Sequence, residues 1–270
     1  MYQRKNQIKA IAKVAKPGNT LYYYSVALVL VLCLLAFSPA SAALSVNINK
    51  TSAQSNFISA ETVLPSIGFR KANANSKSKQ AMRHYNDSEF VIAFRLWLPL
   101  AQDDVVDAQF YTAMMYDMGK GVPRSPKDAV HWYQAAAKAG NHHAQHNLGV
   151  AYADGEGIER DLKKAIYWWQ LSASHGNTDS QYNLGMLYAM GNKTIKRDFG
   201  KAHKWWSRAA SSGDAMAQYN LGSLFANGDG VIKNYCEAVK WWQKSAKNGF
   251  SQASMALQLI VEKDDYKACW

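Results

Sequence analysis

The sequence lacks most of the signatures that enzymes and metal sites require. It has only three cysteines, and one of them, Cys33, lies in an apolar run near the N-terminus. It contains no Gly-x-Ser-x-Gly element, no Gly-Lys-Ser/Thr step of a phosphate loop and no cysteine–histidine nucleophile context. These absences leave no positive reason to assign an activity, so we expect no catalytic residue, no cofactor and no small-molecule substrate.

Dense basic runs are also lacking beyond residue 80. The formal net charge is +11, but five of the positive charges lie in the first 16 residues, which hold no acidic residue. Nucleic-acid binding usually needs basic side chains gathered on one face. We therefore expect no nucleic-acid partner and interpret the remaining charge as a solubilising surface.

The N-terminal segment resembles a secretory leader. A basic stretch over residues 1–20 precedes an apolar run over 21–37 and a small-x-small site at 40–42. Residues 1–42 are interpreted as a cleaved signal peptide or, alternatively, as an inner-membrane anchor through residues 21–37. Both interpretations predict that the remainder lies in a bacterial periplasm. The sequence leaves the pairing of Cys236 and Cys269 open, with free thiols favoured.

Residues 43–79 are rich in Ser, Asn, Ala and Lys and show no helical periodicity, which predicts a flexible linker. Residues 80–104 then resemble a degenerate helical hairpin. Its first helix would be a remnant over 81–85 and its second would span 90–101, with Pro99 near the end.

A tryptophan recurs at intervals of 36, 37 and 36 residues, at Trp132, Trp168, Trp205 and Trp241. Self-similarity at this period predicts a tandem array of helical hairpins. The expected units are 107–140, 141–176, 177–213 and 214–249, followed by a terminal helix over 250–262 and a tail over 263–270. The predicted fold class is an all-α solenoid over 80–262, in which each hairpin is stabilised by stacking on its neighbours.

The second helix of each unit has defined ends. It is expected to begin at a side chain that accepts a hydrogen bond from a first-turn N–H, at Ser125, Asp161, Asp198 and Asn234. It is expected to end at a left-handed glycine, at Gly140, Gly176, Gly213 and Gly249.

The loops inside three units carry paired glycines for a tight turn, at 119 and 121, 155 and 157, and 228 and 230. The third unit departs from this pattern, because its loop from Gly191 to Ile195 has one extra residue and no second glycine. Insertions in repeat arrays often map to a binding edge, and sequence drift is the alternative explanation.

The pattern Ala144-Gln145-x-Asn147-Leu148-Gly149, with the later tryptophan and glycine, resembles the Sel-1-like repeat family. The resemblance implies antiparallel α-hairpins in a right-handed superhelix, similar to tetratricopeptide repeats. It also implies a non-catalytic adaptor or scaffold, often periplasmic or membrane-attached. The first unit departs with Thr112-Ala113 in place of Leu-Gly, which predicts looser packing. A cysteine-rich branch of the family is credited with binding or hydrolysing penicillin-like compounds, but this chain lacks the cysteines of that branch, so the resemblance does not imply that activity here.

Two motifs could suggest a site but are better explained by packing. His142, His143 and His146 have metal-like spacing, yet His146 occupies a slot held by aromatic residues in the other units, so no metal site is expected. The tandem aromatics that begin at each repeat tryptophan could stack on a glycan. We expect the first member to be buried between hairpins and the second to pack at the seam, with a partial surface role for Trp169, Trp206 or Trp242.

Amide side chains recur on the first helices, which line the concave face of such solenoids. The candidate partner-binding residues are Gln145, Asn147, Gln181, Asn183, Gln218 and Asn220. They could hydrogen-bond the backbone of an extended peptide, or each could bond a neighbouring repeat. We therefore predict a scaffold that binds a protein or peptide in the cell envelope. The alternatives are a module that binds cell-wall glycan or peptide and a hydrolase of wall amides or β-lactams.

Overall fold

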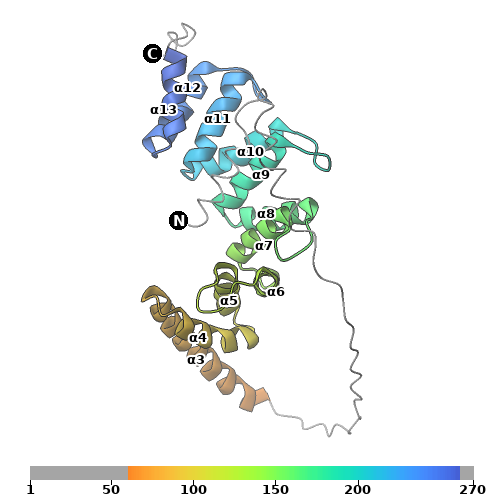
Figure 1. The fold of residues 1–270 in the computed structure, drawn as a ribbon, viewed down its shortest axis with the longest axis vertical. Helices are drawn as coiled ribbons and strands as arrows, with labels where there is room; N and C mark the ends of the chain where they lie inside the picture. The colour runs from red at the N-terminus through yellow and green to blue at the C-terminus, as the bar shows by residue number, and fades with distance from the viewer. Residues whose placement is uncertain (1–59, 262–270) are drawn as a thin grey trace, which may run out of the picture. The chain divides into compact units, whose positions relative to one another are not determined.

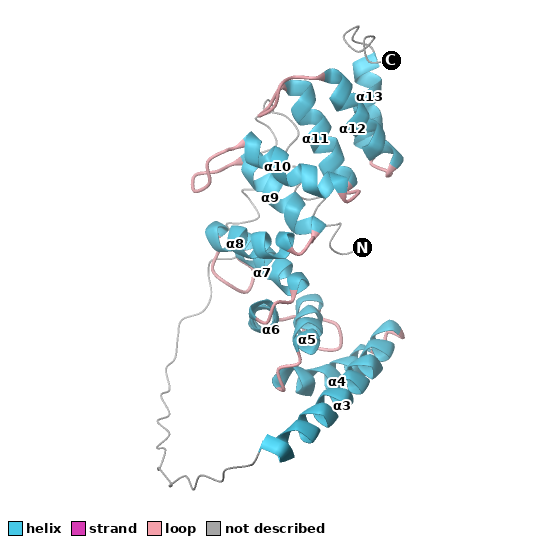
Figure 2. Cartoon of the chain, turned by 180° about the vertical axis from the view of Figure 1, so that it is seen from behind, coloured by secondary structure: helices cyan, strands magenta, loops and turns pink. Residues whose placement is uncertain are grey.

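The computed structural model describes residues 60–261, and this part of the chain consists of helices joined by loops, without strands (Figure 1, Figure 2). The predicted leader (1–42) and tail (263–270) lie outside the described residues, as does Cys269. Within 60–261, none of the helices combines the length and apolar character that a membrane span requires. The helices are α3 (Ala60–Asn86), α4 (Phe90–Gln102), α5 (Val106–Met118), α6 (Pro126–Lys138), α7 (His142–Asp154), α8 (Leu162–Ser174), α9 (Thr178–Met190), α10 (Phe199–Ser211), α11 (Ala215–Asn227), α12 (Tyr235–Lys247) and α13 (Ser251–Val261).

The linker predicted over residues 43–79 overlaps a helix of the structure. Residues 60–79 lie in α3, so the flexible segment and the short helical remnant expected over 81–85 are both wrong here. Tertiary packing explains the difference, because α3 lies against α4. Ala81 is fully buried, and the indole Nε1 of Trp97 donates to Ser78 Oγ over 3.3 Å. The second helix of this hairpin has nearly the predicted bounds, with Pro99 in its last turn.

The remaining helices form the predicted series of hairpins. α5 pairs with α6, α7 with α8, α9 with α10 and α11 with α12, and each second helix also packs on the first helix of the following hairpin. Buried alanines and leucines fill the interfaces, with Leu148, Leu184 and Leu221 no more than 1% exposed. The all-α repeat solenoid predicted from the sequence is therefore confirmed.

The predicted ends of the second helices are confirmed. The side chains of Ser125, Asp161, Asp198 and Asn234 each accept a hydrogen bond from a backbone N–H of the first turn. Gly140, Gly176, Gly213 and Gly249 follow the helices with φ between 83° and 93°. Only glycine adopts this left-handed conformation without strain. The local sequence therefore sets where each hairpin turns.

The burial order within the aromatic pairs is the reverse of the prediction. The second members are buried, with Tyr133, Trp169, Trp206 and Trp242 between 2% and 7% exposed. The first members, Trp132, Trp168, Trp205 and Trp241, are only half-buried. A recurring glycine explains the order, because it lets the second aromatic ring approach the first helix closely. A Cβ at Gly185, for example, would lie 2.4 Å from the Trp206 indole.

Cys236, in the first turn of α12, is disulfide-bonded. The favoured expectation of free thiols is therefore wrong for this residue.

Candidate protein-interaction surface

The three candidate glutamines are not accessible to a partner, contrary to the prediction. Gln145, Gln181 and Gln218 are only 4% to 5% exposed. Each Nε2 donates to a carbonyl near the end of the preceding helix, at Ala137, Ala173 and Ala210, over 3.0 to 3.2 Å. The glutamines therefore bind one hairpin to the next, which is the alternative use that the sequence left open.

The three candidate asparagines lie closer to the surface. Asn147, Asn183 and Asn220 are half-buried on α7, α9 and α11. The Asn147 amide hydrogen-bonds the Tyr133 hydroxyl, and the Asn220 amide bonds that of Tyr182. Burial raises the pKa of Tyr182 to about 12, so its hydroxyl stays protonated. Two of the asparagines, Asn147 and Asn220, thus contact the preceding repeat. The three asparagines remain candidates for partner binding only through the part of each side chain that is exposed.

The histidine cluster serves packing. His146 is 7% exposed and its Nδ1 lies 2.9 Å from Ser180 Oγ in the next hairpin. Burial lowers the pKa of His146 to about 4, so the ring is neutral at physiological pH. Within the described residues, no group of three potential ligands is arranged to hold a metal ion.

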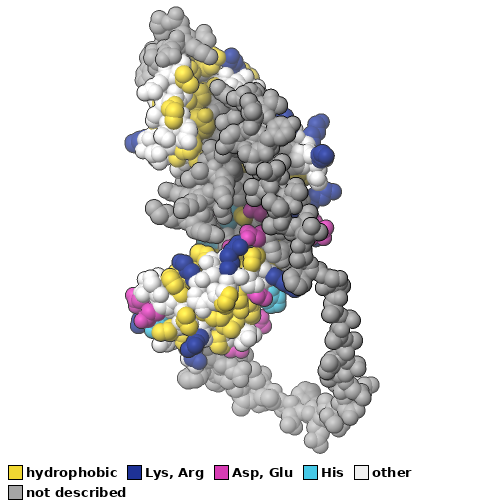
Figure 3. Space-filling view, in the orientation of Figure 1, with side chains coloured by type: hydrophobic (Ala, Val, Ile, Leu, Met, Phe, Trp, Pro, Cys, Tyr) yellow, Lys and Arg dark blue, Asp and Glu magenta, His cyan; other side chains and the backbone are white. Residues whose placement is uncertain are grey.

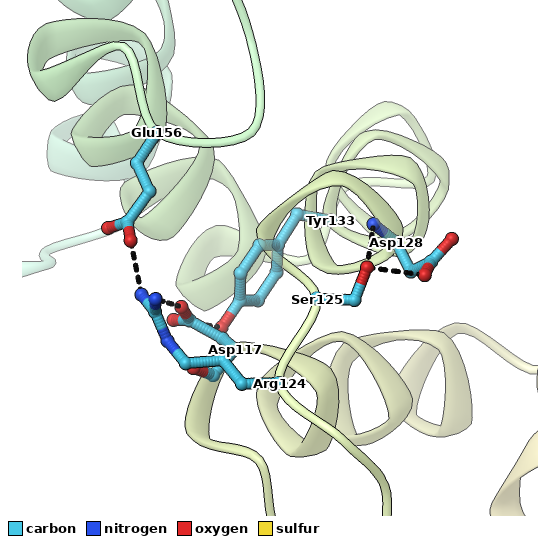
Figure 4. A network of polar contacts seen from close by, with 6 residues as sticks. All are labelled: Asp117, Arg124, Ser125, Asp128, Tyr133 and Glu156. Carbon is cyan, nitrogen blue, oxygen red and sulfur yellow. Dashed lines mark hydrogen bonds and ion pairs between the residues drawn. The ribbon is translucent and has the colours of Figure 1, made fainter. Parts of the chain in front are cut away.

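A polar network closes the seam between the first two repeats (Figure 4). Arg124, in the loop before α6, pairs with Glu156 from the loop between α7 and α8, and lies 4.0 Å from Asp117 Oδ1. The Tyr133 hydroxyl lies 3.4 Å from the other Asp117 oxygen. Burial and the Glu156 charge raise the pKa of Asp117, while Arg124 and the Tyr133 hydroxyl oppose that rise.

The next seam contains a cleft in place of such a network. The first residues of α8 and the irregular loop of the third repeat enclose a volume of about 390 Å³. The cleft is lined by Arg160, Asp161, Leu162, Lys163, Asn192, Lys193 and Thr194. The sequence indicated that this loop is irregular, but it did not identify the cleft or its basic side chains. The available signal was the loss of the second glycine together with the loss of an acidic residue at the position of Glu156.

Half-buried indoles and apolar side chains complete the accessible surface. The Arg208 guanidinium lies 4.8 Å from the ring centre of Trp205, and Lys244 Nζ lies 4.2 Å from that of Trp241. Hydrophobic side chains gather over the α11–α13 end of the array (Figure 3), where Met255 and Leu259 are more than half exposed.

Comparison with known proteins matches the repeats to one family. The Sel1 repeat model matches residues 106–141, 142–177, 178–214 and 215–250, each within one residue of a predicted unit. No curated protein matches the chain.

Solved structures match over most of the array. A Sel1 repeat protein from Oxalobacter formigenes is 31% identical, with a TM-score of 0.61, over 65% of this chain and 71% of that protein. A protective antigen of uropathogenic Escherichia coli with an SLR fold is 30% identical, with a TM-score of 0.66, over 70% of this chain and 42% of that protein. With four matched repeats and these structural relatives, the chain belongs to the Sel1 repeat family.

Proposed function

We propose that the chain is a scaffold that binds a protein or peptide partner in the bacterial cell envelope. Proteins of the Sel1 repeat family are generally protein-interaction scaffolds. The location in the envelope is supported by the leader-like sequence of residues 1–42 and by the disulfide at Cys236.

The single observation that carries the proposal is that most recurring side chains of the array are buried between hairpins. The recurring glutamines and the second aromatic of each pair are buried between hairpins. They therefore build the array and leave binding to residues that differ between the repeats. On the first helices His143, which is exposed, differs between the repeats, and Asn183, which recurs in three of them, is half-buried. A surface of variable side chains on a regular framework suits recognition of another macromolecule.

The alternative of a glycan-binding module has weaker support. This alternative requires a surface position for Trp169, Trp206 or Trp242. All three indoles are buried against glycines. A stacking platform needs an accessible aromatic face. The form of this function that uses the second indole of each pair therefore loses its support.

Site-specific photocrosslinking in intact cells tests the proposal. A photoreactive phenylalanine is placed at His143 on α7 and, separately, at Asn183 on α9. The control position is Gln170, an exposed residue on the second helix α8. We expect a discrete protein adduct from a first-helix position, absent at Gln170, in the envelope fraction. Adducts of equal yield at all three positions, or none from either first-helix position, would contradict the proposal.

A further inference from the structure

The seam between the first two repeats shows how an arginine and an acidic residue close the joint between hairpins. Arg124 Nε donates to the Asp117 carbonyl over 2.9 Å, which fixes the guanidinium beside the next hairpin. Its terminal nitrogen then pairs with Glu156 from the following repeat. Beside this pair, Gly157 lies so close to α6 that a Cβ there would be 2.3 Å from the Pro126 carbonyl oxygen. Both the ion pair and the glycine contact close this seam.

The following seam keeps the arginine and loses the acid. Arg160 Nε donates to the Ala153 carbonyl over 2.9 Å, the same contact that Arg124 makes one repeat earlier. The position of Glu156 is occupied by Asn192, whose side chain accepts from the backbone N–H groups of Thr194 and Ile195 within its own loop. Among residues 73–260, no carboxylate lies within ion-pair distance of Arg160. Its guanidinium is therefore positioned for an anion that residues 73–260 do not supply.

The loss of the second glycine accounts for the cleft at this seam. The loop of the third repeat has no equivalent of Gly157, which lies against the helix of the preceding repeat in the seam before. The resulting cleft of about 390 Å³ is within the range of ligand-binding pockets. Arg160, Lys163 and Lys193 line it and are exposed.

One acidic residue lines the cleft, and its carboxylate is already used. Asp161 Oδ1 accepts from the backbone N–H groups of Lys163 and Lys164 at the start of α8. Its second oxygen lies 3.4 Å from Lys164 Nζ. These contacts lower the pKa of Asp161 and keep it ionised. Three cations against one capping carboxylate leave the cleft with a net positive charge.

We propose that this cleft binds an acidic side chain from a segment of a partner protein. The partner's carboxylate pairs with Arg160 as Glu156 pairs with Arg124, while Lys163 and Lys193 supply further positive charge. The volume admits a side chain with part of its backbone, and the open, charged lining favours a polar segment over an apolar one. The partner thus supplies to Arg160 the carboxylate that Glu156 supplies to Arg124 within the chain.

This inference rests on the proposed scaffold function, because it assigns the acidic segment to a protein partner. It uses a different surface from the first-helix positions His143 and Asn183. Failure of crosslinking at those positions would contradict the proposed function, whereas failure at the cleft would leave that function intact.

Fluorescence anisotropy with the full chain tests the cleft. The probe is a fluorescein-labelled decapeptide of alternating glutamate and glycine, and the matched probe has glutamine in place of glutamate. We expect binding of the glutamate peptide only, weakening as the salt concentration rises. Equal binding of both peptides, or no binding of the glutamate peptide at low salt, would overturn the proposal.

Two substitutions locate the binding. Arg160→Gln removes the central cation, and Lys193→Glu provides an internal carboxylate that competes for Arg160. Each is expected to weaken binding by about tenfold. The control is Lys204→Glu, which makes the same charge change on an exposed residue of α10 outside the cleft. Because all three positions are exposed, circular dichroism should show unchanged folding.

The control also separates a specific cleft from general electrostatic attraction. If Lys204→Glu weakens binding as much as Lys193→Glu, the peptide responds to net charge and the cleft is not its site. A parallel titration uses vesicles of phosphatidylglycerol and phosphatidylcholine. If vesicles bind through Arg160 and Lys193 and the peptide does not, the occupant is a lipid headgroup and the proposal is wrong.

Discussion

The indole of Trp169 lies directly on Gly149, so that a Cβ added to the glycine would be 2.5 Å from the indole Cδ1 and Nε1 atoms. The indole Nε1 donates to the His146 carbonyl on the same helix over 3.2 Å. Gly222 and Trp242 repeat this arrangement, with a hydrogen bond to the Tyr219 carbonyl. The first repeat instead has Ala113 and Tyr133 at these positions, and both are buried. Ring size and the facing residue therefore change together.

The first prediction is that Gly149→Ala destabilises the array. Overpacking against a buried ring costs about 1–3 kcal/mol, which exceeds the gain of roughly 1 kcal/mol from replacing a helical glycine. We expect Trp169→Tyr to recover part of the loss in the double variant, because that variant has the Ala–Tyr combination of the first repeat. Urea unfolding of the four proteins measures the coupling energy, and additive effects of the two substitutions would contradict this account.

The second prediction concerns Asp117, whose pKa is raised chiefly by burial. A carboxyl group with a raised folded-state pKa lowers stability at neutral pH, and the folded state recovers that stability as the pH falls through the raised value. Asp117→Asn keeps an acceptor for the Tyr133 hydroxyl and removes the buried charge. We expect a higher urea midpoint than wild type at pH 7 and a smaller difference at pH 4. A lower midpoint at pH 7 would mean that the Arg124 interaction outweighs burial.

The third prediction is that acid stability depends on His146. Burial lowers the pKa of this ring to about 4 from 6.5 in the unfolded chain. The unfolded state therefore binds a proton first, and stability falls as the pH drops from about 6.5 to about 4. The double variant His146→Phe with Ser180→Ala has the Phe110 and Ala144 combination of the preceding repeat pair. We expect its unfolding free energy to fall less over this pH range.

Urea titrations at pH 7 and pH 4.5 test this difference. His175→Phe is a suitable control, since His175 is exposed at the end of α8. An equal acid loss in wild type and the double variant would show that other groups control the transition.

The sequence predicted the hairpins and their ends because those features depend on local chemistry. A capping side chain such as Asp161 and a left-handed glycine such as Gly176 act within a few residues of themselves. The aromatic order failed because it depends on Gly149, which lies 20 residues from Trp169 and admits only the second indole. α3 was missed because its helical state is supported by packing on α4.

The candidate surface was less predictable for the same reason. Recurrence of Gln145 along the array indicated a role without showing which side the amide faces, and the contact with Ala137 assigns it to the seam. The basic character of the cleft results from the loss of an acidic residue, because Asn192 occupies the position that Glu156 has in the previous repeat. Its importance is clear only once Arg160 is seen to be held in the same way as Arg124.

The last prediction transfers a contact from the fourth repeat to the third. Asn248 Nδ2 donates to Gln218 Oε1 over 3.0 Å and to the Gly213 carbonyl over 3.3 Å. In the third repeat the corresponding residue is Ser212, and the buried Oε1 of Gln181 has no hydrogen-bond partner among the described residues. The backbone angles of the two positions match, with φ and ψ of −82° and 4° at Ser212 and −84° and 13° at Asn248.

Because the backbone already has the required conformation, Ser212→Asn should supply the missing donor without strain. Satisfying one buried acceptor is expected to raise the free energy of unfolding by about 0.5–1.5 kcal/mol. Urea denaturation measures the change, and Ser212→Ala serves as the control that alters the same position without adding a donor. The gain should vanish when Gln181 is also replaced by methionine, since the amide acceptor is then gone. A gain of equal size in the Gln181→Met background would show that the asparagine acts through the helix end alone.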